Sequence, residues 1–154
     1  MEPLTVTIPG KPMGKQRHRT FTRGKFASSY TPTKTVNYET LVKLLFIERY
    51  PNRMNGRPDF VPIDGAVAVG VRAYYQIPKS TSKKRRAMML AGEILPTVKP
   101  DMDNVIKIIS DALNGIAYTD DKNITDYDPS PRKRYSDTPR VEITISRVGD
   151  NESE

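Results

Sequence analysis

Alternating apolar and polar positions predict three strands in this chain. Residues 4–8 and 141–145 alternate with a period of two, which is typical of strands with one buried face. Residues 66–75 also alternate, with Val, Ala and Tyr at every second position. The positions between them hold small residues, including Gly70, which would let a helix cover that face closely.

Helical spacing of apolar residues predicts three helices between the outer strands. Residues 35–50 bring Leu41, Leu44 and Leu45 to one side, and Pro51 ends the pattern. A short helix through Met89 and Leu90 begins after Ser80 or Ser82, which can serve as its N-cap, and ends at Gly92. A third amphipathic helix begins near Asp103, with Asp101 or Asp103 as N-cap, and ends at Asn114 and Gly115.

Residues 11–33 show no sustained period and are expected to form a long basic loop, in which Phe21, Phe26 and Tyr30 lie among the positive charges. No linker or internal repeat divides the chain. We therefore predict a single compact α+β domain over residues 1–147, with a small mixed β-sheet packed by helices, followed by a disordered acidic tail at residues 148–154.

Composition narrows the class of protein. The 154 residues include no cysteine, which excludes a disulfide scaffold, thiolate zinc sites and a cysteine nucleophile. No apolar run approaches the ~20 residues of a membrane span, and the first residues lack the pattern of a signal peptide. We expect a soluble cytoplasmic protein that does not associate with a membrane.

The charge is distributed unevenly along the chain. The formal net charge is +7, which suggests a polyanionic partner such as nucleic acid. Residues 101–128 nevertheless hold seven aspartates against two lysines, a net charge of −5, so the remainder of the chain carries +12. Either the acidic segment faces away from the polyanion, or hard cations such as Mg²⁺ neutralise it and bring phosphate to it.

The aspartates of this segment lie at both ends of the third predicted helix. Helix capping would explain one carboxylate, and an i, i+4 ion pair with Lys107 would explain another. Neither explains why two aspartates lie at each end of the helix. A helix of about 12 residues is ~18 Å long, and the seven steps from Asn114 to Asp121 reach at most ~25 Å. The segment after the helix is therefore just long enough to bring Asp121 back to Asp101 and Asp103. Lys107 lies one helical turn after Asp103.

These residues carry a family resemblance. The segment KPDMDN at residues 99–104, followed by Lys107, DALNG at 111–115 and the pair Asp120–Asp121, resembles the signature of RusA-family Holliday junction resolvases. Residues 77–80 and 83–85 resemble the family as well, and residues 10–12 do so loosely. The specific part covers about residues 77–125, roughly a third of the chain.

The resemblance implies a small, often phage- or prophage-borne, Mg²⁺-dependent endodeoxyribonuclease that acts as a homodimer on four-way DNA junctions in recombination and repair. It assigns Asp101, Asp103 and Asp121 to the metal and Lys107 to catalysis. Asn123 stands where the family pattern has Gln, which affects a contact around the metal site. We expect DNA-backbone binding by ten basic residues: Lys11, Lys15, Arg17, Arg19, Arg23, Lys25, Lys83, Lys84, Arg85 and Arg86.

Two alternatives remain open at the level of sequence. One is a non-catalytic basic module that binds nucleic acid and whose aspartates only cap and solvate. The other is a metal nuclease for other branched or single-stranded DNA. His18, the single histidine, fits a general base in type, but its neighbours Arg17 and Arg19 favour binding of the DNA backbone.

Overall fold

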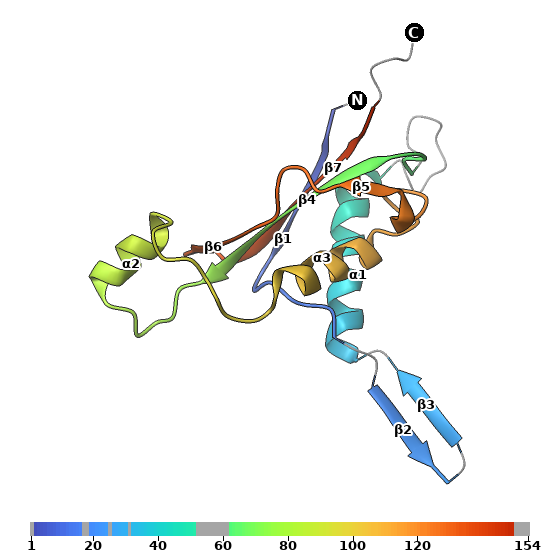
Figure 1. Ribbon diagram of the computed structural model, residues 1–154, viewed down its shortest axis with the longest axis horizontal. Helices are drawn as coiled ribbons and strands as arrows, with labels where there is room; N and C mark the ends of the chain where they lie inside the picture. The colour runs from blue at the N-terminus through green and yellow to red at the C-terminus, as the bar shows by residue number, and fades with distance from the viewer. Residues whose placement is uncertain (1, 17–18, 25, 31, 52–61, 150–154) are drawn as a thin grey trace.

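The computed structural model describes residues 2–16, 19–24, 26–30, 32–51 and 62–149. Its elements, in chain order, are β1 (Leu4–Pro9), β2 (Arg19–Arg23), β3 (Phe26–Tyr30), α1 (Thr33–Arg49), β4 (Val67–Gln76), α2 (Lys83–Leu90), α3 (Met102–Ala112), a 3-10 turn η2 (Asp121–Asn123), β5 (Ile124–Asp126), β6 (Arg132–Ser136) and β7 (Arg140–Arg147). The α+β class predicted from sequence is confirmed (Figure 1).

Five strands form one mixed sheet. Its order is β1-β7-β4-β5, and β6 also pairs with β4. Strands β1 and β4 run antiparallel to β7, whereas β5 and β6 run parallel to β4 along successive parts of one edge. The sequence did not predict the short strands β5 and β6, because strands of three to five mostly polar residues show no clear alternation.

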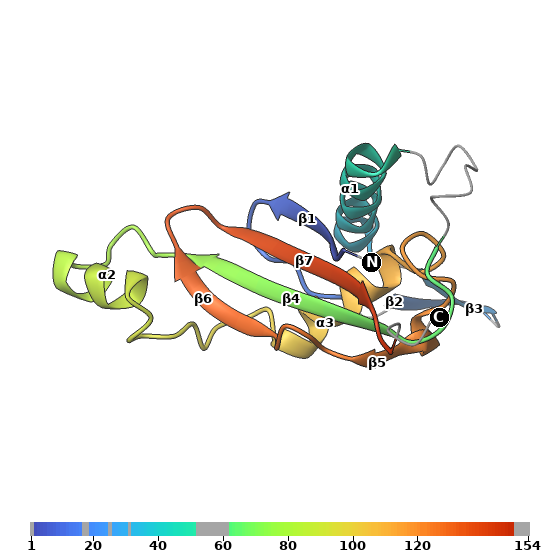
Figure 2. The same cartoon turned by 90° about the horizontal axis from the view of Figure 1, so that it is seen from above.

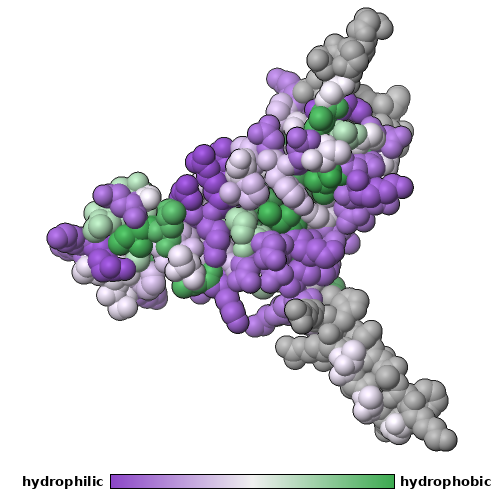
Figure 3. All heavy atoms as spheres, viewed as in Figure 1, coloured by the Kyte–Doolittle hydropathy of each residue, from purple (hydrophilic) through white to green (hydrophobic). Residues whose placement is uncertain are grey.

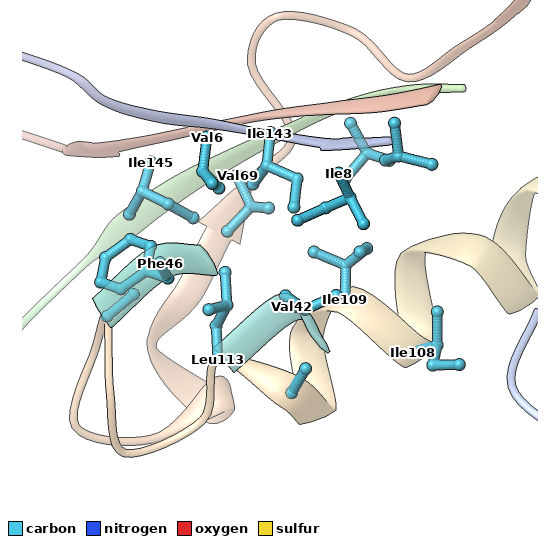
Figure 4. Close-up of a cluster of buried hydrophobic side chains, with 14 of the residues drawn as sticks. Val6, Ile8, Val42, Phe46, Val69, Ile108, Ile109, Leu113, Ile143 and Ile145 are labelled. Carbon is cyan, nitrogen blue, oxygen red and sulfur yellow. The ribbon is translucent and has the colours of Figure 1, made fainter. Parts of the chain in front are cut away.

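The core lies between one face of this sheet and the helices α1 and α3 (Figure 2). The register aligns Val6, Ile143 and Val71 across the strands β1, β7 and β4. Figure 4 shows that side chains of the sheet, such as Ile143 and Val69, point toward Val42, Phe46 and Ile109 of the helices. The alternation that predicted the three long strands therefore identified their buried face.

Helix α1 buries a different face from the one predicted. Leu41 and Leu44 are exposed, whereas Tyr38, Val42 and Phe46 form the buried stripe at i, i+4 and i+8. Leu45, the third residue of the predicted stripe, packs partly buried against the core, so the buried face is rotated from the predicted one and only partly overlaps it.

The predicted long loop contains a hairpin. Strands β2 and β3 pair antiparallel, from Arg19 with Tyr30 to Arg23 with Phe26. This hairpin projects from the body as a separate two-stranded sheet (Figure 1). The sequence did not predict this hairpin, because the segments RTFTR and FASSY show no sustained alternation of apolar and polar residues.

A loop, rather than a helix, covers the second face of β4. A Cβ atom added at Gly70 would lie 2.8 Å from Pro129 N and 3.0 Å from Asp128 O. The segment that joins β5 to β6 therefore passes directly over this strand. The prediction of a closely covered face was right, but its covering element was wrong: at Gly70 the face is covered by Asp128 and Pro129, in the connection between β5 and β6.

We expect Gly70→Ala to lower the free energy of unfolding by about 1–3 kcal/mol, the usual cost of overpacking. The new methyl group meets backbone atoms, which cannot move aside as a flexible side chain can. Urea denaturation measures the change. Thr144→Ala, at the position of β7 paired with Gly70, is the matched control, and an equal loss in the control would contradict the argument.

The α2 arm, residues 77–98, projects from the other end of the molecule (Figure 1). Ser82 is the N-cap of α2, and its hydroxyl accepts a hydrogen bond from the backbone N–H of Arg85 at 3.3 Å. Gly92 adopts a φ of 80° after the helix, as the predicted stop requires. Among the described residues, no helix has the length and apolar character needed to cross a membrane.

Candidate active site

Helix α3 presents a polar stripe on the side away from the core. Its buried side is formed by Val105, Ile108, Ile109 and Ala112, and Asp103 and Lys107 are exposed. The predicted apolar spacing of this helix is thereby confirmed in its main positions. Figure 3 shows that hydrophilic residues occupy much of the surface in the middle of the body in this view.

The start of α3 is fixed by backbone contacts. Asp101 occupies the N-cap position, and its carbonyl oxygen accepts a hydrogen bond from the N–H of Val105 at 3.0 Å. The hydroxyl of Tyr75, on β4, donates to the carbonyl oxygen of Pro100 at 2.6 Å. Burial, with the nearby charge of Asp101, raises the pKa of Tyr75 to about 12, so this donor stays protonated.

The two carboxylates at this end are not consumed by helix capping. The side chain of Asp101 makes no capping hydrogen bond, although the residue stands at the N-cap. Oδ1 of Asp103 accepts only the local N–H of Asn104, at 3.0 Å. Both residues are exposed, so their oxygens remain available to a ligand.

The aspartate pair after the helix is held against it by Tyr118. This buried side chain donates its hydroxyl hydrogen to the carbonyl oxygen of Ser110 at 2.7 Å, which ties the returning chain to α3. Asp120 caps η2, and its Oδ1 accepts from the N–H of Lys122 at 3.0 Å. The chain after the helix therefore returns to the second half of α3, and the predicted approach of Asp121 to Asp101 and Asp103 stays a prediction.

The pKa values of Asp120 and Asp121 are shifted in opposite directions, because the two carboxylates have different surroundings. The N–H of Lys122 and the hydrogen bond to Asp121 lower the pKa of Asp120. Partial burial raises the pKa of Asp121, and the hydrogen bond and charge of Asp120 and the charge of Asp111 raise it further, against the opposing charge of Lys107. Asp121 is thus close to both Asp111 and Lys107 of α3.

An ion network joins α3 to the N-terminal part of the chain. Lys107 Nζ lies 3.3 Å from Asp111 Oδ1, and Lys15 Nζ lies 3.1 Å from the other oxygen of the same carboxylate. Lys15 also lies 2.6 Å from Glu39 Oε2 on α1. Burial alone would lower the pKa of Lys15, but hydrogen bonds and charges from Glu39 and Asp111 outweigh it and raise the pKa.

The loop that carries Lys15 packs directly on α3. The N–H of Lys15 donates to the carbonyl oxygen of Asn104 at 2.9 Å, and a Cβ atom added at Gly14 would lie 2.8 Å from Pro100 Cβ. Sequence reasoning assigned Lys15 to the DNA backbone and gave Glu39 no role. Residues 15, 39 and 111 are far apart in the chain, and each carries an ordinary charge, so no local pattern could reveal their contact.

We expect Lys15→Met and Glu39→Gln to be energetically coupled. Each single substitution should lower the free energy of unfolding by about 1–3 kcal/mol, the range for hydrogen bonds to charged groups. The double variant should lose less than the sum, because the second substitution removes a contact that is already broken. Urea denaturation of the four proteins measures the coupling, and additive losses would contradict the network.

The carboxylates of α3 and η2 fit a hard cation in chemistry. Within residues 2–16, 19–24, 26–30, 32–51 and 62–149, no three acidic or histidine side chains converge closely enough to hold one ion. Mg²⁺ usually binds one or two carboxylates together with water and substrate phosphate, so a full protein cage is not required. Asp101 makes no capping hydrogen bond, Asp103 accepts one from its neighbour Asn104, and negative charges act on Asp121, which suits such a partial site.

The basic residues predicted to bind DNA occupy two projecting arms and the body. Arg19 and Arg23 belong to β2, whereas Arg17, His18 and Lys25 lie outside the described residues. Residues 83–86 form the first turn of α2, where Arg86 makes an ion pair with Asp137. Asn123, at the position that departs from the family pattern, donates to Thr119 Oγ1 at 2.8 Å.

Fold and site define a basic α+β domain with exposed carboxylates and a lysine on one helix. The family model for "Endodeoxyribonuclease RusA" matches residues 9–146. The chain therefore belongs to the RusA endodeoxyribonuclease family, a family of Holliday junction resolvases, which confirms the resemblance drawn from residues 77–125. It is also similar to the uncharacterized protein YqaN of Bacillus subtilis (strain 168), with 33% identity over 150 residues, covering 96% of this chain and 99% of that protein.

Proposed function

We propose that this protein is a Mg²⁺-dependent endonuclease that resolves four-way DNA junctions by paired, symmetric hydrolysis of two phosphodiester bonds. A junction has approximate two-fold symmetry, so a homodimer with one site in each subunit would cut opposite strands. The observation that carries the proposal is the exposure of Asp103 and Lys107 on one side of α3, within the segment that the family model matches. The charge of Lys107 also acts on Asp121, which follows in the same segment.

The residues of the proposed site have separate roles in hydrolysis. Asp101, Asp103 and Asp121 would hold Mg²⁺, which supplies polarisation of the phosphate and acidification of water when bound. Lys107 presents its ammonium group at the same face and stabilises negative charge that develops on the phosphate oxygens. Asp111 accepts a hydrogen bond from Lys107 and so fixes the direction of that side chain.

The basic arms would hold the DNA on either side of this stripe. The β2–β3 hairpin and the α2 arm project from opposite ends of the body (Figures 1 and 2). Contacts between lysine or arginine and phosphate are independent of sequence and weaken steeply with salt. Two separated arms suit a branched substrate, whose duplexes diverge from one point.

The test compares a four-way junction, a Y-form and a linear duplex, each with Mg²⁺ and with EDTA. We expect paired, symmetric nicks in the junction that require Mg²⁺, and little cutting of the linear duplex. Random nicking of linear duplex would contradict junction resolution and favour a nuclease of other specificity. Binding of all three DNAs without any cutting would favour the non-catalytic module.

A further inference from the structure

A groove of about 490 Å³ lies beside the start of α3, between the end of the sheet and the base of the α2 arm. Its size falls within the roughly 300–1,000 Å³ of sites that bind small molecules. Three lysines, Lys11, Lys79 and Lys99, line this groove, which we call the lysine-lined groove, and none of its described lining residues is acidic. The charge of the groove therefore suits a phosphate-bearing ligand.

The walls of the groove are apolar and aromatic. Val98 and Tyr135 contribute side chains to the lining, and Val98 is 54% exposed. Lys133 Nζ donates to the carbonyl oxygen of Val98 at 2.7 Å and lies 4.9 Å from the centre of the Tyr75 ring, which fixes this wall against the sheet. Flat apolar walls with lysines at the rim are the combination that binds a base and its phosphate.

The groove is continuous with the candidate active site. It shares Pro12, Lys99 and Pro100 with a second hollow of about 480 Å³, which is lined in turn by Lys15 and Asp101. A DNA strand whose phosphate lies at Asp101 therefore has its neighbouring nucleotide within reach of the groove. The groove and this hollow adjoin because Lys99, Pro100 and Asp101 are consecutive.

We propose that the lysine-lined groove binds one unpaired nucleotide of the DNA strand, next to the phosphate that is cut. Its base lies against Val98 and Tyr135, and its phosphate is neutralised by the three lysines. This inference rests on the proposed function and specifies the substrate: a branch point offers an unstacked nucleotide, whereas a linear duplex first has to be unstacked. The groove thereby selects branched DNA at the site of cutting.

Val98→Trp tests the groove, because an indole ring at this exposed position fills it without changing any charge. Leu44→Trp, at a leucine of α1 that is 58% exposed, is the matched control. The probe is a four-way junction that carries 2-aminopurine beside the cut phosphate, and its fluorescence is read with EDTA, so that no cutting occurs. Cutting rates are then measured with Mg²⁺.

We expect wild-type protein and Leu44→Trp to change the 2-aminopurine fluorescence equally and to cut within twofold of each other. Val98→Trp should abolish the fluorescence change and slow cutting at least tenfold, and the Lys11→Gln, Lys79→Gln double variant should weaken both. A normal fluorescence change and cutting rate in Val98→Trp, or equal losses in both tryptophan variants, would overturn the proposal. If wild-type protein cuts no junction, the proposed function fails, while the fluorescence measured without metal still decides the groove.

Discussion

Replacing Asp103 or Asp121 with Asn should reduce Mg²⁺-dependent cutting of a four-way junction by at least about 100-fold, since even residues that only contact metal ligands cost 10–100-fold. The amide keeps the size of the side chain but removes the negative charge that a hard cation needs. Binding of the junction in EDTA should persist, because the basic arms are unchanged. Gel-based cleavage and binding assays measure the two quantities separately.

Asp126→Asn is the matched control for these variants. Asp126 belongs to the same acidic segment and is exposed, but its carboxylate accepts a hydrogen bond from the hydroxyl of Thr125 on β5. The Asp126→Asn variant should therefore cut the junction at the wild-type rate. Cutting at the wild-type rate by Asp103→Asn or Asp121→Asn would reject the assigned site, and equal losses in all three would indicate a general effect of negative charge.

Lys107→Gln should slow cutting by about 10²–10³-fold, the usual effect of removing one group that stabilises charge in the transition state. The side chain is 60% exposed, so the fold should remain intact. Affinity for the junction should change little, because Lys107 is one cation among 25 lysines and arginines. Single-turnover cleavage at saturating protein isolates this loss from binding.

Lys122→Gln controls for the loss of one positive charge in the acidic segment. Lys122 is exposed, and only its backbone N–H is hydrogen-bonded to Asp120, so its side chain can be replaced without breaking that contact. We expect this variant to cut normally. A loss confined to binding in Lys107→Gln, with an unchanged rate at saturation, would assign Lys107 to the DNA backbone rather than to the chemistry.

Strand and helix positions were predictable wherever the apolar period was long. Eleven residues of α3 carry a continuous apolar stripe, and Val141, Ile143 and Ile145 of β7 alternate with polar positions. The loop predicted over β2 and β3 was wrong, and no strand was predicted at β5 or β6, because short strands are held by pairing with a neighbour and carry no clear period of their own. The buried face of α1 also depended on the shape of the space beneath the sheet.

The sequence by itself determined the motif that resembles the family and so which residues we propose for the chemistry. The spacing of Asp101, Asp103 and Lys107 follows from one helix, and the length of the segment to Asp121 permits its return; their joint action on a metal stays a prediction. Only the tertiary structure decided their surroundings: the contact of Lys15 with Glu39 and Asp111, and the groove beside Pro100, join segments far apart in the chain. Such contacts arise from the packing of the whole domain, which no local period encodes.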